Sequence, residues 1–246
     1  MGTKFSTRIW VSVVGIASIF LGSKGYADTV ISVADFGLKP DTRENAVAYV
    51  QKAIEACRGK EPVTLVFPEG RYDFWPQYAH EKNYYETNTY DVFPKRLAML
   101  FEGLHNITVD GNGSQFVMHD RIQPITVENC DGVTLKNFSI DWDIPLTAQA
   151  RVTKVGSDFF EIGINVLESP YIIEDGKLVF VGEGWKSALG SMIEFESDTH
   201  FVVPGTGDLV LGWNWGDYTA VSPRYGIVRL SRKGGFERYP AEGNWL

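Results

Sequence analysis

The sequence contains little cysteine or histidine. Its two cysteines, Cys57 and Cys130, are too few for a disulfide framework and too far apart for a metal-binding pair. We therefore expect two free thiols. The four histidines, at positions 80, 105, 119 and 200, show no i, i+4 spacing typical of zinc ligands. The sequence thus predicts no metal centre, and it contains no motif that calls for a cofactor.

Basic residues are also scarce. The 246 residues include 23 lysines and arginines against 31 aspartates and glutamates, which gives a formal net charge of −8. Binding to nucleic acid needs clustered basic side chains that neutralise phosphates. We therefore expect no nucleic-acid partner.

The longest apolar run lies at the start of the chain, over residues 9–21. It follows the basic residues Lys4 and Arg8 and precedes the small-residue pattern that ends at Ala27. This order is typical of a secretory signal, and the run is too short to span a bilayer comfortably. The sequence predicts a signal peptide over residues 1–27, cleaved after Ala27. The mature protein would then be periplasmic or secreted, with no membrane insertion.

A repeat is the most informative feature that is present. The segment His105–Gly111 returns 26 residues later as Asp131–Asn137, and the apolar positions Ile107 and Val109 are apolar again in the second copy. Apolar residues alternate with a period of two, which indicates strands rather than helices.

Two further strand-like runs, at 115–118 and 124–127, lie between the copies, so each repeat holds about three short strands. One such coil cannot bury its own apolar face and must stack on the next. The sequence therefore predicts an all-β protein that begins with a right-handed parallel β-helix.

Residues 28–149 are expected to form the amino-terminal coils of this solenoid. An entry strand near Val30 and an amphipathic helix over 45–57 would cover the first coil, whose first strand lies in 63–72. An aromatic insertion, placed at 74–100, interrupts the repeat by about 18 residues.

From residue 150 to 246 the 26-residue rhythm stops. Short alternating runs are joined by hairpin turns such as Asp175-Gly176, which predicts an inserted, antiparallel β-barrel-like domain. The expected strands are 150–155, 159–164, 171–173, 178–181, 192–196, 201–203, 209–213 and 225–230. No closing cap follows, so we expect this domain to be truncated and the chain to be the amino-terminal part of a longer protein.

Four stretches together resemble glycoside hydrolase family 110, the exported bacterial α-1,3-galactosidases: Phe67 to Pro76, Tyr84 to Arg96, Val109 to Ser114 and Val133 to Trp142. The solenoid elements alone would fit any protein with a pectin-lyase-like fold. The resemblance implies a β-helix interrupted by β-barrels and an inverting enzyme that removes terminal α-1,3-linked galactose from blood-group-B-like glycans.

In that family the catalytic aspartates lie on coils that resume after the first barrel. They belong to an Asp-Asp segment that has no counterpart in this chain. We therefore assign no catalytic residue here. The expected partner is a glycan with a terminal α-galactose.

Candidate binding residues come from the end of the second repeat. Asp141 and Asp143 flank Trp142, and in an extended segment their side chains point the same way, about 6.5–7 Å apart at the backbone. An inverting glycosidase holds its two carboxyl groups about 6.5–9.5 Å apart. The pair could therefore serve catalysis or line a cleft, or it could be two solvated acids. Glu194 and Glu196 repeat the spacing, but we interpret them as the water-facing side of a strand.

Further candidates are aromatic and basic. Trp75, Tyr84 and Tyr85 in the insertion could stack on a sugar, although such rings also pack an insertion onto its host. His119 and Arg121, at a coil corner, could donate hydrogen bonds to a ligand or could simply satisfy a turn.

Three functions are compatible with these patterns. The leading one is a glycosidase whose amino-terminal part this chain forms. A non-catalytic glycan-binding module, or an inactive remnant, is the alternative. A polysaccharide lyase is the third, although such enzymes use a carboxylate cluster for calcium, and no acidic cluster falls on consecutive coils.

Overall fold

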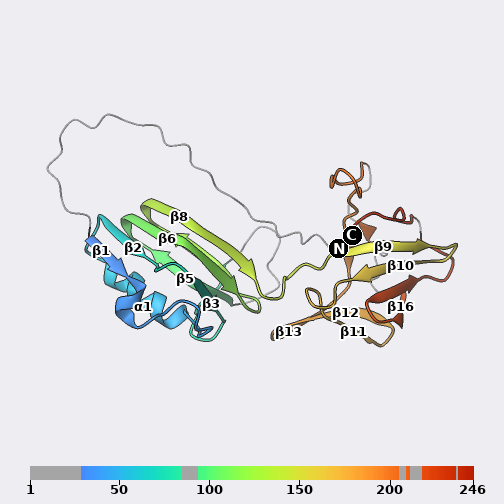
Figure 1. The fold of residues 1–246 in the computed structure, drawn as a ribbon, viewed down its shortest axis with the longest axis horizontal. Helices are drawn as coiled ribbons and strands as arrows, with labels where there is room; N and C mark the ends of the chain where they lie inside the picture. Colours follow the sequence, from blue (N-terminus) through green and yellow to red (C-terminus); the bar gives the residue numbers. More distant parts are fainter. Residues whose placement is uncertain (1–28, 85–93, 205–208, 211–217, 237) are drawn as a thin grey trace. The chain divides into compact units, whose positions relative to one another are not determined.

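The computed structural model describes residues 29–84, 94–204, 209–210, 218–236 and 238–246. The chain divides into two compact units, the first ending at Asp143 and the second beginning at Ile144. Both are built mainly of β-strands (Figure 1). The predicted signal peptide and Tyr85 lie outside the described residues. Across the part of the chain that the structure describes, no helix is long and apolar enough to cross a bilayer.

The first unit opens with β1 (Thr29–Ser32), the 3-10 turn η1 (Val33–Phe36) and the helix α1 (Val47–Cys57). The Ser32 hydroxyl accepts a hydrogen bond from the backbone of Ala34, which helps to start η1. One stripe of α1 is buried at helical spacing, as the sequence predicts, and consists of Val47, Val50, Ala53, Ile54 and Cys57. Cys57 and Cys130 are both free.

Parallel strands form most of the rest of this unit (Figure 1). They are β2 (Val63–Val66), β3 (Arg71–Phe74), β5 (Lys95–Glu102), β6 (His105–Met118), β7 (Gln123–Glu128) and β8 (Asp131–Trp142). The first half of β6 pairs with β2 and its second half with β3, while β8 pairs along both halves of β6. The strands β5 and β7 form a separate parallel ladder.

The register of these ladders follows the repeat. Ile107 lies beside Val133, and Val109 lies beside Leu135, so the two copies of the repeat stack directly on each other. This part of the prediction is confirmed. The corners are made by residues in the left-handed region, where asparagine and glycine are favoured; Asn137, for example, has a φ of 60°.

The aromatic insertion is shorter than predicted. The structure places Met99 beside Ile125, so the repeat resumes at Lys95 and not near residue 100. The short strand β4 (His80–Lys82) runs antiparallel to β5. The strand β5 could not be recognised from the sequence, because Leu97, Ala98 and Met99 are all buried. The alternation of apolar and polar residues that marks a strand is therefore missing here.

Aromatic rings fill the core of the first unit. Phe116 lies at the centre, with its ring 4.7 Å from that of Phe67, 5.6 Å from Phe74 and 4.8 Å from Phe138, centroid to centroid. Three successive passes of the chain therefore contribute to one cluster. Stacked and edge-on ring pairs of this kind add stability beyond the apolar area they bury.

Gly111 allows the strands β6 and β8 to approach each other closely. A Cβ atom at this position would lie 2.5 Å from Cβ of Phe138 and 2.7 Å from the carbonyl oxygen of Asn137. Because part of this obstacle is backbone, Gly111→Ala is expected to destabilise the unit by about 1–3 kcal/mol. Hydrogen–deuterium exchange of the β6 and β8 amides would report this as faster exchange.

The matched control for Gly111→Ala is Gly103→Asn. Gly103 has a φ of 63°, and a Cβ atom added to it would meet nothing within 4 Å. Its counterpart one repeat later is Asn129, with a φ of 52°. Unchanged exchange is expected for this variant. Unchanged exchange in Gly111→Ala would show that β8 does not need this close approach.

The second unit is antiparallel. One sheet has the order β16 (Thr219–Arg224), β17 (Ile227–Ser231), β10 (Phe159–Ile164) and β9 (Ala150–Val155). A second sheet contains β11 (Tyr171–Glu174), β12 (Lys177–Gly182) and β13 (Trp185–Ala188), and β14 (Ser191–Met192) pairs with β15 (Leu209–Val210). The hairpin at Asp175-Gly176 forms as predicted, with φ of 50° and 70°.

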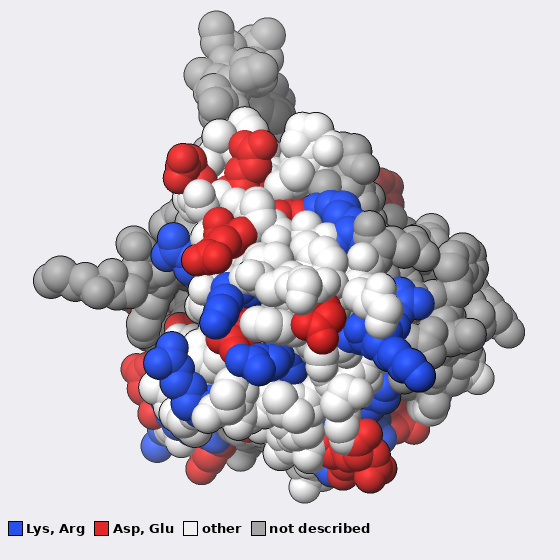
Figure 2. Space-filling view, turned by 90° about the vertical axis from the view of Figure 1, so that its right-hand side faces the viewer, with Lys and Arg blue, Asp and Glu red and all other residues white. Residues whose placement is uncertain are grey.

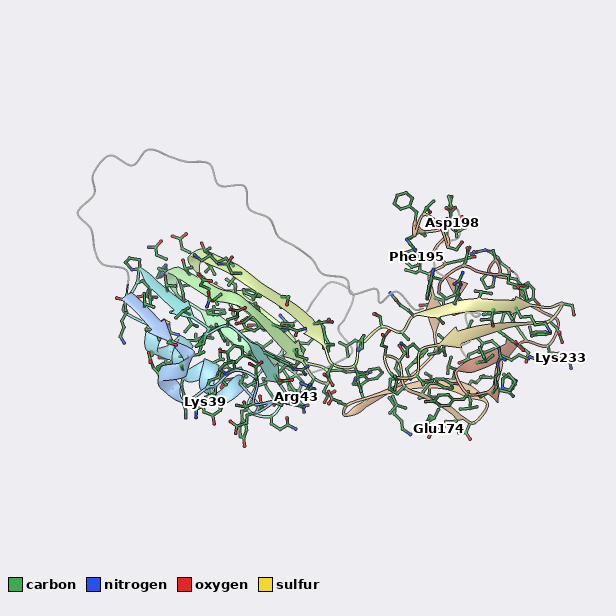
Figure 3. All side chains as sticks on the ribbon, viewed as in Figure 1. Lys39, Arg43, Glu174, Phe195, Asp198 and Lys233 are labelled. Carbon is green, nitrogen blue, oxygen red and sulfur yellow. The ribbon has the colours of Figure 1, made fainter. Side chains whose placement is uncertain are left out.

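Two strands of this unit, β13 and β16, were not predicted, and two predicted runs are reduced. The expected strands 192–196 and 201–203 amount to the two residues of β14 and an isolated bridge between Phe195 and Val202. Figure 3 shows the side chains, with Glu174 at the turn between β11 and β12. On the face drawn in Figure 2, basic and acidic side chains lie among one another.

The interpretation of Glu194 as water-facing is wrong. Glu194 is 2% exposed, while its neighbour Ile193 is 42% exposed. Its carboxylate forms an ion pair with Arg238 and accepts hydrogen bonds from the backbone of Ala241 and the side chain of Asn244, both at 2.8 Å. These partners lie in residues 238–244, which cover the segment that carries Glu194.

Candidate functional site

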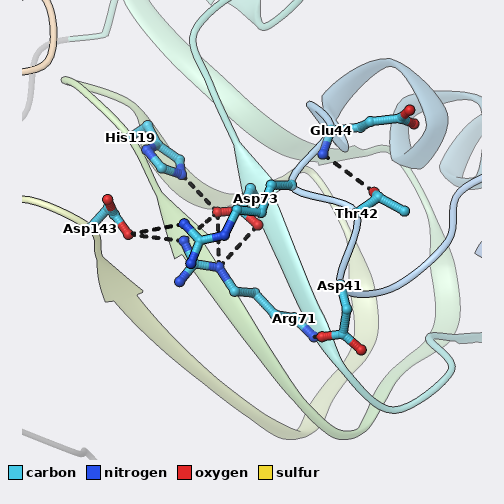
Figure 4. A network of polar contacts seen from close by, with 8 residues as sticks. Asp41, Thr42, Glu44, Arg71, Asp73, His119 and Asp143 are labelled. Atoms are coloured by element: carbon cyan, nitrogen blue, oxygen red, sulfur yellow. Dashed lines mark hydrogen bonds and ion pairs between the residues drawn. The ribbon is translucent and has the colours of Figure 1, made fainter.

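Three charged side chains and a histidine meet at one end of the first unit (Figure 4). Arg71 and Asp73 are two residues apart on β3, and the Arg71 Nε lies 3.0 Å from each carboxylate oxygen of Asp73. The Arg71 guanidinium also reaches Oδ1 of Asp143 at 2.9 Å. His119 Nε2 lies 2.8 Å from Oδ1 of Asp73. We call Arg71, Asp73, His119 and Asp143 the charged cluster.

The strand register creates this cluster. Phe74, Met118 and the last residue of β8 lie side by side in β3, β6 and β8. The residues that follow them, Trp75, His119 and Asp143, therefore succeed one another across the ends of these three strands. The Trp75 and His119 rings are stacked, with centroids 3.8 Å apart and an angle of 11° between their planes.

Two members of the charged cluster are removed from water. The side chain of Asp73 is 0% exposed and that of His119 is 2% exposed. Burial by itself raises the pKa of Asp73, but the hydrogen bonds from Arg71 and His119 outweigh it, so that this pKa is lowered overall. The hydrogen bond to Asp73 raises the pKa of Arg71. Arg71 and Asp73 are therefore both charged at neutral pH.

A second layer of polar contacts holds the cluster in place. The Asn45 side chain accepts a hydrogen bond from the backbone of Trp75 at 3.2 Å and donates one to the carbonyl of Gln77 at 2.9 Å. The Asp41 carboxylate accepts one from the Arg71 backbone at 2.9 Å. These contacts fix the start of the insertion and the strand that carries Arg71.

The structure brings together three of the residues singled out in the sequence: Trp75, His119 and Asp143. Arg71, Asp73 and Asn45 were missed. The alternating Arg-Tyr-Asp of β3 was a possible signal, because it places two opposite charges on one face of a strand.

The other predicted residues near this end lie outside the cluster. Asp141 is exposed, and its carboxylate accepts a hydrogen bond at 2.8 Å from the backbone of Trp142. The Trp142 indole donates to the carbonyl of Asp120 at 3.2 Å. Arg121 is exposed. Asp143, in contrast, belongs to the cluster, because its carboxylate accepts a hydrogen bond from the Arg71 guanidinium.

Tyr84 belongs to a different group of side chains. Its hydroxyl donates a hydrogen bond to Glu128, and Lys82 forms ion pairs with Glu102 at 2.6 Å and with Glu128 at 2.9 Å. Since Glu102 and Glu128 are neighbours across the β5–β7 ladder, this group fastens the insertion to that sheet. In the structure Tyr84 therefore contacts the sheet that carries the insertion, and its role toward a sugar stays a prediction.

The charged cluster offers chemistry suited to a sugar. An indole ring beside buried charged groups can stack on the C–H face of a pyranose, while guanidinium and carboxylate groups bind its hydroxyls. Trp75 is only partly buried.

Comparisons with known proteins define the relationship. The α-1,3-galactosidase B of Bacteroides thetaiotaomicron is 56% identical over 222 residues, which are 89% of this chain and 36% of that protein. The chain belongs to the α-1,3-galactosidase family. This confirms the resemblance to glycoside hydrolase family 110 seen in the sequence.

Other family members agree with this. The α-1,3-galactosidase A of Shewanella woodyi is 36% identical over 68% of this chain and 28% of its own length. The α-1,3-galactosidase B of Parabacteroides distasonis is 34% identical over 83% of this chain and 34% of its own length. Residues 148–246 match the family model described as GLAA-B beta-barrel domain I. The chain thus spans about a third of the length of these relatives.

Proposed function

We propose that this chain is part of an exported glycoside hydrolase that releases terminal α-1,3-linked galactose with inversion at the anomeric carbon. Residues 1–27 would direct the export. The observation that carries the proposal is the 56% identity to a named α-1,3-galactosidase over 89% of the chain. Since the chain spans about a third of that relative, the catalytic aspartates would lie in sequence beyond residue 246.

We further propose that the first unit is the start of a right-handed parallel β-helix. The parallel ladders with a 26-residue register support it. In such a solenoid, residues that follow equivalent strands line one edge of the fold. The charged cluster and Trp75 would form part of a glycan-binding wall on that edge.

The direct test is hydrolysis of α-1,3-galactobiose by the protein expressed from its whole reading frame, including any continuation after the codon for Leu246. Galactose is expected, and proton NMR of the first product should show the β-anomer. Release of α-galactose would overturn the inverting mechanism alone. No release of galactose would overturn the proposed activity and favour a non-catalytic glycan-binding module.

The variant Trp75→Ala tests the binding wall. Loss of one stacking ring is expected to raise KM about tenfold with little change in kcat, because the ring binds ground state and transition state alike. Tyr78→Ala is the control, since Tyr78 lies in the same insertion and is 74% exposed. Equal KM values for the two variants would show that Trp75 only packs against His119.

A further inference from the structure

The second unit contains a hollow of its own, apart from the charged cluster. The space within it is about 330 Å³, a figure that includes the open solvent at its mouth. Aromatic side chains, prolines and two serines line it. The residues that matter to the argument are Phe180, Trp185, Ser169 and Ser187.

The hairpin of β12 and β13, labelled in Figure 1, contributes Phe180, Val181, Trp185 and Ser187 to the lining of the hollow. Phe180 lies directly opposite Ser187, and Gly182 lies directly opposite Trp185. Because alternate residues of a strand share a face, all four lie on the same face of the hairpin. An indole, a phenyl ring and a hydroxyl are thereby grouped on one side of two paired strands.

Gly182 fixes the position of the indole. A Cβ atom on Gly182 would lie 2.1–2.4 Å from three atoms of the Trp185 ring, so the ring rests on the glycine backbone. No other residue type leaves this space. The position of Phe180 is also fixed, because its side chain packs against the buried core of the second unit. The two rings are therefore in place before a ligand arrives, which lowers the entropic cost of binding.

We propose that this hollow is a second glycan-binding site, which takes one terminal galactoside. The ring of Trp185 would stack on the sugar, and the hydroxyls of Ser169 and Ser187 would bind its hydroxyl groups. The choice of galactose rests on the function proposed above. Galactose has an axial 4-hydroxyl, which leaves a continuous C–H face on the other side of the ring for an aromatic residue.

The test is NMR titration of the whole protein, labelled with nitrogen-15 in its tryptophan indoles, with methyl α-galactopyranoside. A saturable shift of the Trp185 signal, assigned from the variant Trp185→Phe, is expected. Methyl α-glucopyranoside, whose 4-hydroxyl is equatorial, is expected to bind at least about fivefold more weakly. No saturable shift with the galactoside would overturn the proposal.

Two variants sharpen this result. Gly182→Ala retains every lining side chain but displaces the indole, so the affinity for the galactoside should fall about tenfold or more. Trp75→Ala, in the other unit, should leave this titration unchanged. A loss of affinity in Trp75→Ala but not in Gly182→Ala would place the galactoside at the charged cluster instead.

The two proposals fail separately. Galactose release by a protein with no response at Trp185 would reject the second site and retain the proposed hydrolase. A saturable response at Trp185 without any galactose release would retain the site and reject the hydrolase.

Discussion

Phe116→Ala is expected to lower the free energy of unfolding of the first unit by about 3–5 kcal/mol. Phe116 is fully buried, and its ring contacts those of Phe67 and Phe74 from the preceding pass of the chain and that of Phe138 from the following pass. Removing the ring leaves a cavity that these rigid neighbours cannot close. Urea unfolding, followed by hydrogen exchange of the β3 and β6 amides, would measure the loss.

Two further variants serve as references for this loss of unfolding free energy. Phe116→Leu keeps most of the volume and should cost clearly less than Phe116→Ala. Val30→Ala should change stability by less than about 0.5 kcal/mol, because Val30 is 64% exposed. A loss below about 1 kcal/mol in Phe116→Ala would mean that the aromatic cluster is not the centre of this core.

Asp73→Asn is expected to destabilise the first unit by about 3 kcal/mol. The Asp73 carboxylate is completely buried and accepts hydrogen bonds from Arg71 and His119. Neutralising it leaves the positive charge of Arg71 with Asp143 as its remaining carboxylate partner among the described residues, and a poorly compensated charge in such a place is costly. Urea unfolding at pH 7 would measure the effect.

The same variant should change the dependence of stability on pH. The pKa of Asp73 is lowered in the folded state, so its contribution is complete above the unfolded value of about 3.9 and is lost as pH falls through the lower, folded value. The wild type should therefore lose stability below about pH 4 more steeply than Asp73→Asn. Equal slopes would show that the pKa of Asp73 is the same in the folded and the unfolded state.

Asp143→Asn is the matched control for Asp73→Asn. Both residues bind Arg71, but the Asp143 side chain is 38% exposed. Its replacement should lower the free energy of unfolding by less than about 1 kcal/mol, because water screens an exposed ion pair and solvates the Arg71 guanidinium. Similar losses in the two variants would contradict the distinction between a buried and an exposed partner.

Local patterns were sufficient for much of the fold. The repeat at Ile107 and Val109 predicted stacked strands, and their pairing with Val133 and Leu135 confirms it. The helix α1 and the hairpin at Asp175-Gly176 also follow from short-range signals, namely helical spacing and turn residues. The strand β5 was missed because three consecutive buried residues, Leu97, Ala98 and Met99, interrupt its alternation. The handedness of the coils and the pectin-lyase-like fold stay predictions.

The candidate site was only partly predictable. Trp75, His119 and Asp143 were singled out one by one, for their chemistry, in segments that are far apart in the sequence. Nothing local connects them to Arg71 and Asp73. They meet because three parallel strands end in register, so that residues following equivalent strands are stacked.

The sequence by itself determined where the strands repeat, where the pattern changes and to which family the chain is related, because these depend on residue types and their spacing. Tertiary structure alone decided which charges are buried. Asp73 and Glu194 alternate with apolar neighbours as surface acids do, yet both are covered by segments far away in the sequence. Burial is a property of what packs against a residue, and one strand's pattern does not contain that information.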